Sequence, residues 1–167
     1  MKTKKVIGMF AAMMMVVTMS VVTVNAQTEG DKAVGASIAF GSGNSYSNIG
    51  IEGKFLYNLT DPIRLGCALT YFLKKDYVSY WDFSAYGHYL VNMTDKLIAY
   101  PLVGLGVHGY NSKIDESSSS GSEFAISLGG GLEYKLSARL ALNAELKYKI
   151  IDNTNRLIVS AGFNYKF

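Results

Sequence analysis

Cysteine, proline and sustained helical periodicity are all scarce in this sequence. The single cysteine, Cys67, cannot form an internal disulfide, so other interactions must hold the domain together. Two prolines among 167 residues, together with 17 glycines and 12 tyrosines, favour β structure. No stretch after residue 26 has the 3.6-residue spacing of apolar residues that predicts an amphipathic helix.

Clusters of residues that carry chemistry are missing as well. No group of His, Cys, Asp and Glu has the spacing of a metal site, so we expect no metal and no cofactor. No predicted helix follows the glycine runs, which argues against a phosphate-binding loop. His88 and His108 are expected to be structural hydrogen-bonding residues, because each is a lone histidine at an inward position of a polar face. We therefore predict that the protein is not an enzyme.

The N-terminal segment has the pattern of a secretory signal peptide. Three lysines within the first five residues precede an apolar run, and the letters VNA at 24–26 supply a small-x-small cleavage site. We predict a signal peptide at 1–26 and one domain at 27–167. An uncleaved membrane anchor is the alternative, because the run approaches a spanning length.

The predicted mature domain carries no excess of charge. Three of the 16 basic residues lie in the signal segment, which leaves 13 basic and 13 acidic residues. A formal charge of zero gives no support for nucleic-acid binding, and we expect no such partner.

Apolar and polar residues alternate along eight segments of the predicted domain, which is typical of strands with one apolar face. The segments cover 32–41, 48–58, 63–73, 79–91, 97–110, 122–135, 139–150 and 157–167. Compact turns follow the second, fourth and sixth segments, whereas connections at 42–47, 74–78, 111–121 and 151–156 join the others. Asn, Asp, Gly and Ser supply the turn chemistry.

The polar faces of these segments are rich in small residues, which suits the narrow bore of an eight-stranded barrel. A soluble barrel would instead carry large charged side chains on its outer face. Charged residues at inward positions can pair with one another, as buried charges require. We predict a lumen ion-pair network of Glu52, Lys54, Arg64, Asp82, Glu133, Arg139, Glu145, Lys147 and Lys149, with Lys166 also inward. The sequence thus predicts an all-β, eight-stranded antiparallel up-and-down transmembrane β-barrel.

Aromatic residues recur where the even-numbered segments end. Tyr57, Tyr134 and Tyr165 occupy matching positions and Tyr89 a similar one, which indicates an interfacial girdle. Pro101 conflicts with this regular pattern, because a closed barrel offers no unpaired position for its missing donor. We expect a local bulge there, or a strand that begins near Tyr100.

The stretches "YNLTDPIRLG", "YPLVGLGVHGY", "ISLGGGLEYKL" and the terminal "FNYKF" resemble the outer-membrane β-barrel family of Gram-negative bacteria, which is porin-like and of the OmpA/OmpX type. The resemblance implies insertion among outer-membrane lipids and a last strand that pairs with the first. It also implies that the barrel-assembly machinery reads the terminal aromatic strand, here Phe163, Tyr165 and Phe167.

Three classes of function agree with this resemblance. A structural or surface-interaction role is favoured, with the four connections at 42–47, 74–78, 111–121 and 151–156 outside the cell and both mature ends in the periplasm. A narrow channel or conduit for small molecules is the alternative. Some barrels of this size modify lipid A, so an enzyme is the third class. We expect a monomer, and the sequence identifies no surface ligand.

Overall fold

The computed structural model describes residues 28–43, 47–75, 78–114, 117–152 and 154–167. The predicted signal peptide at 1–26 lies outside the described residues. The described chain forms one antiparallel sheet. Its strands are β1 (Lys32–Gly43), β2 (Ser47–Asn58), β3 (Ile63–Lys75), β4 (Val78–Tyr89), β5 (Val91–Asn92), β6 (Leu97–Ile114), β7 (Ser117–Lys135), β8 (Leu140–Ile151) and β9 (Arg156–Lys166).

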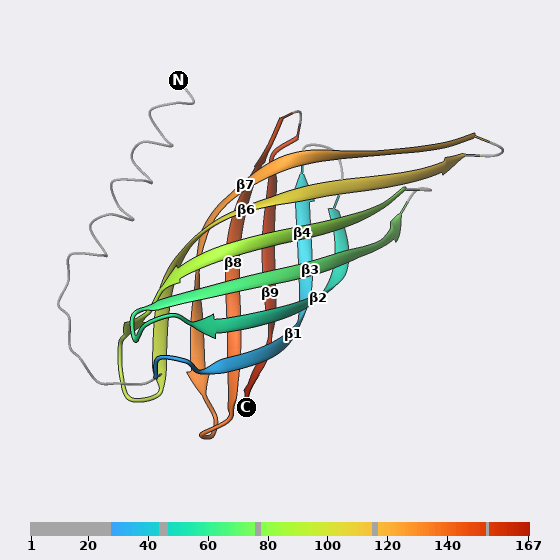
Figure 1. The fold of residues 1–167 in the computed structure, drawn as a ribbon. Helices are drawn as coiled ribbons and strands as arrows, with labels where there is room; N and C mark the ends of the chain where they lie inside the picture. Colours follow the sequence, from blue (N-terminus) through green and yellow to red (C-terminus); the bar gives the residue numbers. More distant parts are fainter. Residues whose placement is uncertain (1–27, 44–46, 76–77, 115–116, 153) are drawn as a thin grey trace.

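The sheet closes on itself. The strand order is β4-β3-β2-β1-β9-β8-β7-β6-β5, and β4 pairs in addition with β6. The last strand pairs with the first, from Ala33 opposite Lys166 to Gly43 opposite Arg156. Because β5 continues β4 in one register against β6, the wall has eight strands, and the predicted closed barrel is confirmed (Figure 1). Closure leaves the aromatic C-terminal strand without an open edge.

Proline explains why β4 and β5 are separate. Leu90 donates its backbone N–H to the carbonyl of Pro62 at 2.7 Å, so the backbone groups of Tyr89 point the opposite way, toward β6. The register places Pro101 opposite Tyr89, and Pro101 has no N–H to donate. One ladder bond is therefore missing. The expected bulge is absent between these described strands, because the register is the same on both sides of Leu90.

One end of the barrel, the turn end, carries three turns of the same design. In each, a residue just after a strand donates its backbone N–H to the carbonyl four positions later, at 2.9 Å. A Thr or Ser side-chain oxygen accepts from the N–H of the residue that opens the next strand, at 3.0–3.2 Å. The oxygens belong to Thr60, Thr94 and Ser137. This repeat explains the sharp return of the chain after β2, β5 and β7.

The opposite end, the ribbon end, is uneven. β4 pairs with β6 only as far as Ser112, and β8 pairs with β7 only from Ala125. Beyond these points β6 and β7 pair with each other up to Ile114 opposite Ser117, and they extend past the other strands as a two-stranded ribbon (Figure 1). The prediction of a long connection at 111–121 is corrected. The pairing of β6 with β7 continues beyond the wall, because the added residues can form backbone N–H to carbonyl hydrogen bonds across the ribbon.

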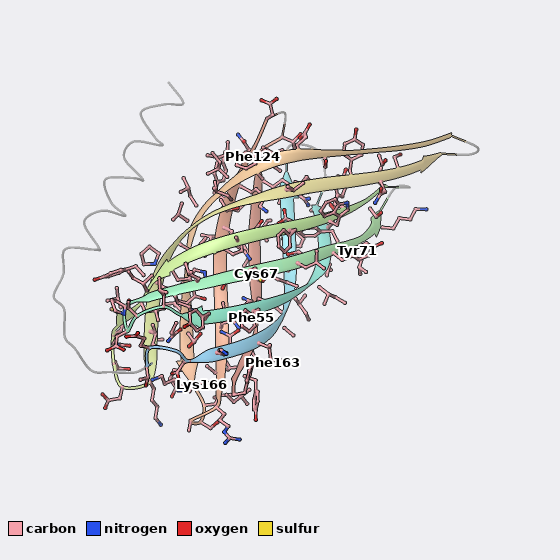
Figure 2. All side chains as sticks on the ribbon, viewed as in Figure 1. Phe55, Cys67, Tyr71, Phe124, Phe163 and Lys166 are labelled. Atoms are coloured by element: carbon pink, nitrogen blue, oxygen red, sulfur yellow. The ribbon has the colours of Figure 1, made fainter. Side chains whose placement is uncertain are left out.

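The outer face of the wall is apolar. Large hydrophobic side chains on every long strand are between about a third and two thirds exposed, including Ile38 on β1 at 68% and Leu146 on β8 at 52%. Figure 2 shows Phe55, Tyr71, Phe124 and Phe163 on four different strands of this surface. The predicted girdle tyrosines lie at the turn end, each opposite the first residue of the preceding strand in the ladder. The apolar outer face covers all eight strands of the wall, as is typical of a barrel that contacts lipid.

Small residues on the inner face admit large ones from neighbouring strands. A Cβ added to Gly131 would lie 2.5 Å from Cζ of Tyr100, whose ring crosses the bore. Tyr100 itself is 2% exposed. Glycine at position 131 therefore makes room for an aromatic side chain in the lumen.

Candidate functional site: the charged lumen

Two strands that β1 and β9 separate in the wall, β2 and β8, supply the central ion-pair cluster. Lys147 of β8 contacts Glu52 of β2 at 2.5 Å and Glu145 of its own strand at 3.1 Å. Lys54 of β2 contacts Glu145 at 3.0 Å and Glu52 at 3.4 Å. All four side chains are at most 5% exposed. Two lysines and two glutamates thus form a neutral group that spans the bore.

A second cluster lies between this group and the turn end. Arg64 of β3 donates to Glu133 of β7 at 2.9 Å and to the ring of His88 at 3.2 Å. Asn164 of β9 also donates to Glu133, at 2.7 Å. Tyr100 connects the two clusters, because its hydroxyl donates to Glu145 at 2.8 Å while the Arg64 guanidinium lies 4.8 Å from its ring centre.

A third cluster lies toward the ribbon end. Asp82 of β4 pairs with Lys149 of β8, and it accepts from Ser84 at 2.8 Å. His108 of β6 lies 3.4 Å from Asp82 and 3.4 Å from Nη1 of Arg156. The Arg156 guanidinium also packs over Phe72 at 4.5 Å and over Tyr80 at 5.1 Å. Aromatic rings and paired charges together fill this part of the bore.

The structure places eight of the nine predicted network residues in the lumen, each at most 7% exposed. They are Glu52, Lys54, Arg64, Asp82, Glu133, Glu145, Lys147 and Lys149. The prediction for Arg139 is wrong, because this residue lies exposed in the turn after β7. Its backbone N–H is held by Ser137 Oγ at 3.3 Å, and β8 begins only at Leu140. Lys166 lies at the rim and pairs with Asp31 at 2.5 Å (Figure 2).

Arg156 is the main lumen residue that the sequence argument missed. It was assigned to the connection at 151–156, but it begins β9 and is 1% exposed. The signal was present: even-numbered positions of the last segment point inward, and residue 156 continues that parity. The sequence does not predict the role of Tyr100 in the network, because its partner Glu145 lies on a non-neighbouring strand.

The predicted assembly residues lie on the outer face. Phe163, Tyr165 and Phe167 are 49%, 41% and 65% exposed. The backbone of Phe167 is tied to the first strand, because its N–H donates to the carbonyl of Lys32 at 3.1 Å. The terminal aromatic is thus held at the seam between β9 and β1.

The comparisons with known proteins agree with this geometry. The family model described as "Outer membrane protein beta-barrel domain" matches residues 10–167. The chain belongs to this family. No curated protein matches the sequence. The protein is therefore an outer-membrane β-barrel, and its apolar outer face meets the lipid of that membrane.

Three solved structures have the same fold. The attachment invasion locus protein Ail of Yersinia pestis is 17% identical with a TM-score of 0.63, and the match covers 84% of this chain and 100% of Ail. Neisserial surface protein A is 17% identical with a TM-score of 0.66, covering 82% and 96%. The N-terminal β-barrel domain of Pseudomonas aeruginosa OprF is 18% identical with a TM-score of 0.69, covering 84% and 100%. At these identities the likeness shows the fold alone.

Proposed function

We propose that the protein is a closed structural barrel that displays the β6–β7 ribbon at the cell surface. The observation that carries this proposal is the length of the ribbon strands, 18 and 19 residues against 11–13 in the other long strands. The wall does not need the extra residues, since β4 and β8 pair with only part of them. A two-stranded ribbon that extends beyond the barrel presents a surface to partners outside the membrane.

The filled lumen supports this role over that of a conduit. The central cluster joins the non-neighbouring strands β2 and β8 through pairs at 2.5 Å and 3.0 Å, and Lys147 and Lys149 are at most 1% exposed. Solute passage would require these charges to separate inside a narrow bore, which is costly because each would lose its partner. Paired, buried charges also favour a structural task over catalysis.

The proposal includes an orientation. The turn end and both mature termini face the periplasm, and the connections at 42–47, 74–78, 111–121 and 151–156 face outward. We also propose that the chain is a monomer assembled by the barrel-assembly machinery through its last strand. Labelling of intact cells with a membrane-impermeant thiol reagent tests the orientation, after Cys67 is replaced by Ser. Ser118→Cys should react, whereas Asp61→Cys and Asp95→Cys should not; the reverse pattern would invert the topology.

Conductance and binding test the role itself. Purified protein in lipid vesicles should give no stable steps large enough for sugars, and such steps would favour the conduit. For binding, the control replaces residues 111–120 with Asn-Gly, a two-residue turn between Tyr110 and Gly121, which are paired in the ribbon. Residues 111–123 carry one lysine against three acidic residues, so a cationic probe such as polylysine suits the ribbon better than an anionic one. Purified protein with the full ribbon should retain polylysine better than protein with the shortened one, and equal retention would argue against a binding role for the ribbon.

A further inference from the structure

A cavity of about 170 Å³ opens at the turn end of the barrel. Its walls come from β1, β2, β3, β7, β8 and β9 and from the turn between β7 and β8. This volume is roughly ten times the minimum that one water molecule needs, so a small polyatomic ion fits. The cavity lies on the turn-end side of the central cluster, and the lumen network does not account for it.

Basic residues predominate around this cavity. Four cationic side chains at inward or turn positions line it, namely Arg64, Lys135, Arg139 and Lys166, against the two carboxylates of Asp31 and Glu133. The difference is two positive charges. The carboxylates are already engaged, because Asp31 pairs with Lys166 at 2.5 Å and Glu133 pairs with Arg64 at 2.9 Å. The excess charge therefore creates a positive potential at the mouth of the barrel.

Arg64 provides a second, independent observation. It is 2% exposed and uses Nη1 for Glu133 and Nε for His88. Its Nη2 is buried and has no hydrogen-bond partner among the described residues. A buried guanidinium N–H that lacks an acceptor is costly, so a ligand that supplies an oxygen there would be favoured.

The depth of the cavity indicates the class of anion. Tyr134 and Tyr165 mark the membrane interface at this end of the barrel, and they lie on two of the strands that line the cavity. Phosphate groups of lipid headgroups occur at that depth, and free phosphate can enter from the aqueous side. A phosphate also suits cations that surround it from several strands, because its oxygens accept from arginine and lysine together.

We propose that the turn-end cavity is a phosphate-binding site, with Arg64 at its base and Lys135 and Arg139 at its rim. The role of Arg139 is then ligand capture instead of lumen pairing. Arg139 is exposed and Lys135 is half-buried at the end of β7, so their side chains can be changed without opening the core of the barrel.

Titration of inorganic phosphate into the full mature chain, folded in a nonionic detergent, tests the site. Calorimetry should show saturable binding, and the double variant Lys135→Gln with Arg139→Gln should weaken it at least tenfold. Lys96→Gln is the matched control, because Lys96 is exposed in another turn at the same end and does not line the cavity. It should change the affinity less than twofold. Heat-modifiable gel migration checks that each variant is folded.

Competition identifies the source of the phosphate. Short-chain phosphatidylglycerol that displaces inorganic phosphate at lower concentration identifies a lipid headgroup, whereas displacement only at higher concentration identifies free phosphate. Either result supports the site, provided that the double variant weakens it. The proposal is overturned if neither probe binds saturably, or if Lys96→Gln weakens binding as much as the double variant does.

Discussion

Lys147 and Lys166 each form an ion pair at 2.5 Å, one in the middle of the barrel and one at its turn end. The Lys147 side chain is 2% exposed and contacts two carboxylates, whereas the Lys166 side chain is 40% exposed and contacts one. Water can solvate Lys166 when its partner is lost, but it has little access to Lys147. The same contact therefore has different energetic weight at the two depths, and the following substitutions measure that difference.

Removal of one carboxylate from the central cluster should have the largest effect. Glu145→Ala leaves Lys54 and Lys147 sharing Glu52, and it also removes the acceptor of the Tyr100 hydroxyl. Breaking a buried pair in this way typically costs about 3–5 kcal/mol. The free energy of unfolding from urea titration in detergent should fall by about that amount.

Arg139→Ala is the matched control for this loss. Alternation along the segment 139–150 predicts the same inward position for Arg139 and Glu145, but Arg139 lies exposed in a turn. Its removal should change the free energy of unfolding by no more than ~0.5 kcal/mol. A loss as large as that of Glu145→Ala would place Arg139 inside the network after all.

The outer face should show the same dependence on depth. Leu146 lies at the middle of β8 and Leu136 in the turn before it, and both are about half exposed. Leu146→Arg should cost about 2–4 kcal/mol in a bilayer, and Leu136→Arg about 0–1 kcal/mol, because arginine at the rim reaches water. Refolding into lipid vesicles measures both. Equal losses would show that Leu146 is not at mid-membrane depth.

The C-terminal strand separates stability from assembly. Phe163→Ser and Phe167→Ser each remove a lipid-exposed aromatic, which should cost about 1–3 kcal/mol of apolar burial. Refolding in detergent should therefore suffer similarly for the two. In cells, Phe167→Ser should accumulate unfolded in the periplasm, while Phe163→Ser should assemble nearly normally, as heat-modifiable gel migration of membrane fractions would show. Equal losses in both assays would make Phe167 only a packing residue.

The architecture could be predicted from sequence because it depends on a period of two. Alternation fixed which residues share a face, and the small, charged composition of one face identified it as the lumen. The eight alternating segments predicted the number of strands. The aromatic C-terminal segment indicated that the last strand pairs with the first.

Strand ends and pairings could not be predicted in the same way. Arg139 and Arg156 were both misplaced at strand boundaries, where local hydrogen bonds such as that from Ser137 decide the first strand residue. The contact of Lys54 with Glu145 joins strands that are not neighbours in the sheet. Such contacts depend on the stagger of the whole barrel, which no single segment of sequence specifies.

The rim pair of Asp31 and Lys166 should have the smallest effect. Burial opposes ionisation of Asp31, but the hydrogen bond from Lys166, the backbone N–H of Thr28 and nearby positive charge outweigh it, so the pKa of Asp31 lies below its usual 3.8. A lowered pKa in the folded state stabilises the fold above pH 3.8, and this contribution disappears as the pH falls through the folded value. Its size should be at most ~1 kcal/mol, as for exposed pairs.

A pH series compares this rim pair with its own deletion. Wild-type protein and Asp31→Asn should differ in free energy of unfolding by that small amount at pH 7. The difference should shrink as the pH falls below 3.8 and should vanish once Asp31 is protonated in the folded state. High salt should reduce the difference at pH 7, because an exposed pair is screened. Glu145→Ala should keep most of its deficit in high salt, since water and ions do not reach its cluster. The stability loss of Asp31→Asn could instead be as large and as resistant to salt as that of Glu145→Ala. In that case depth in the barrel would not explain a difference between the ion pairs of Lys147 and Lys166.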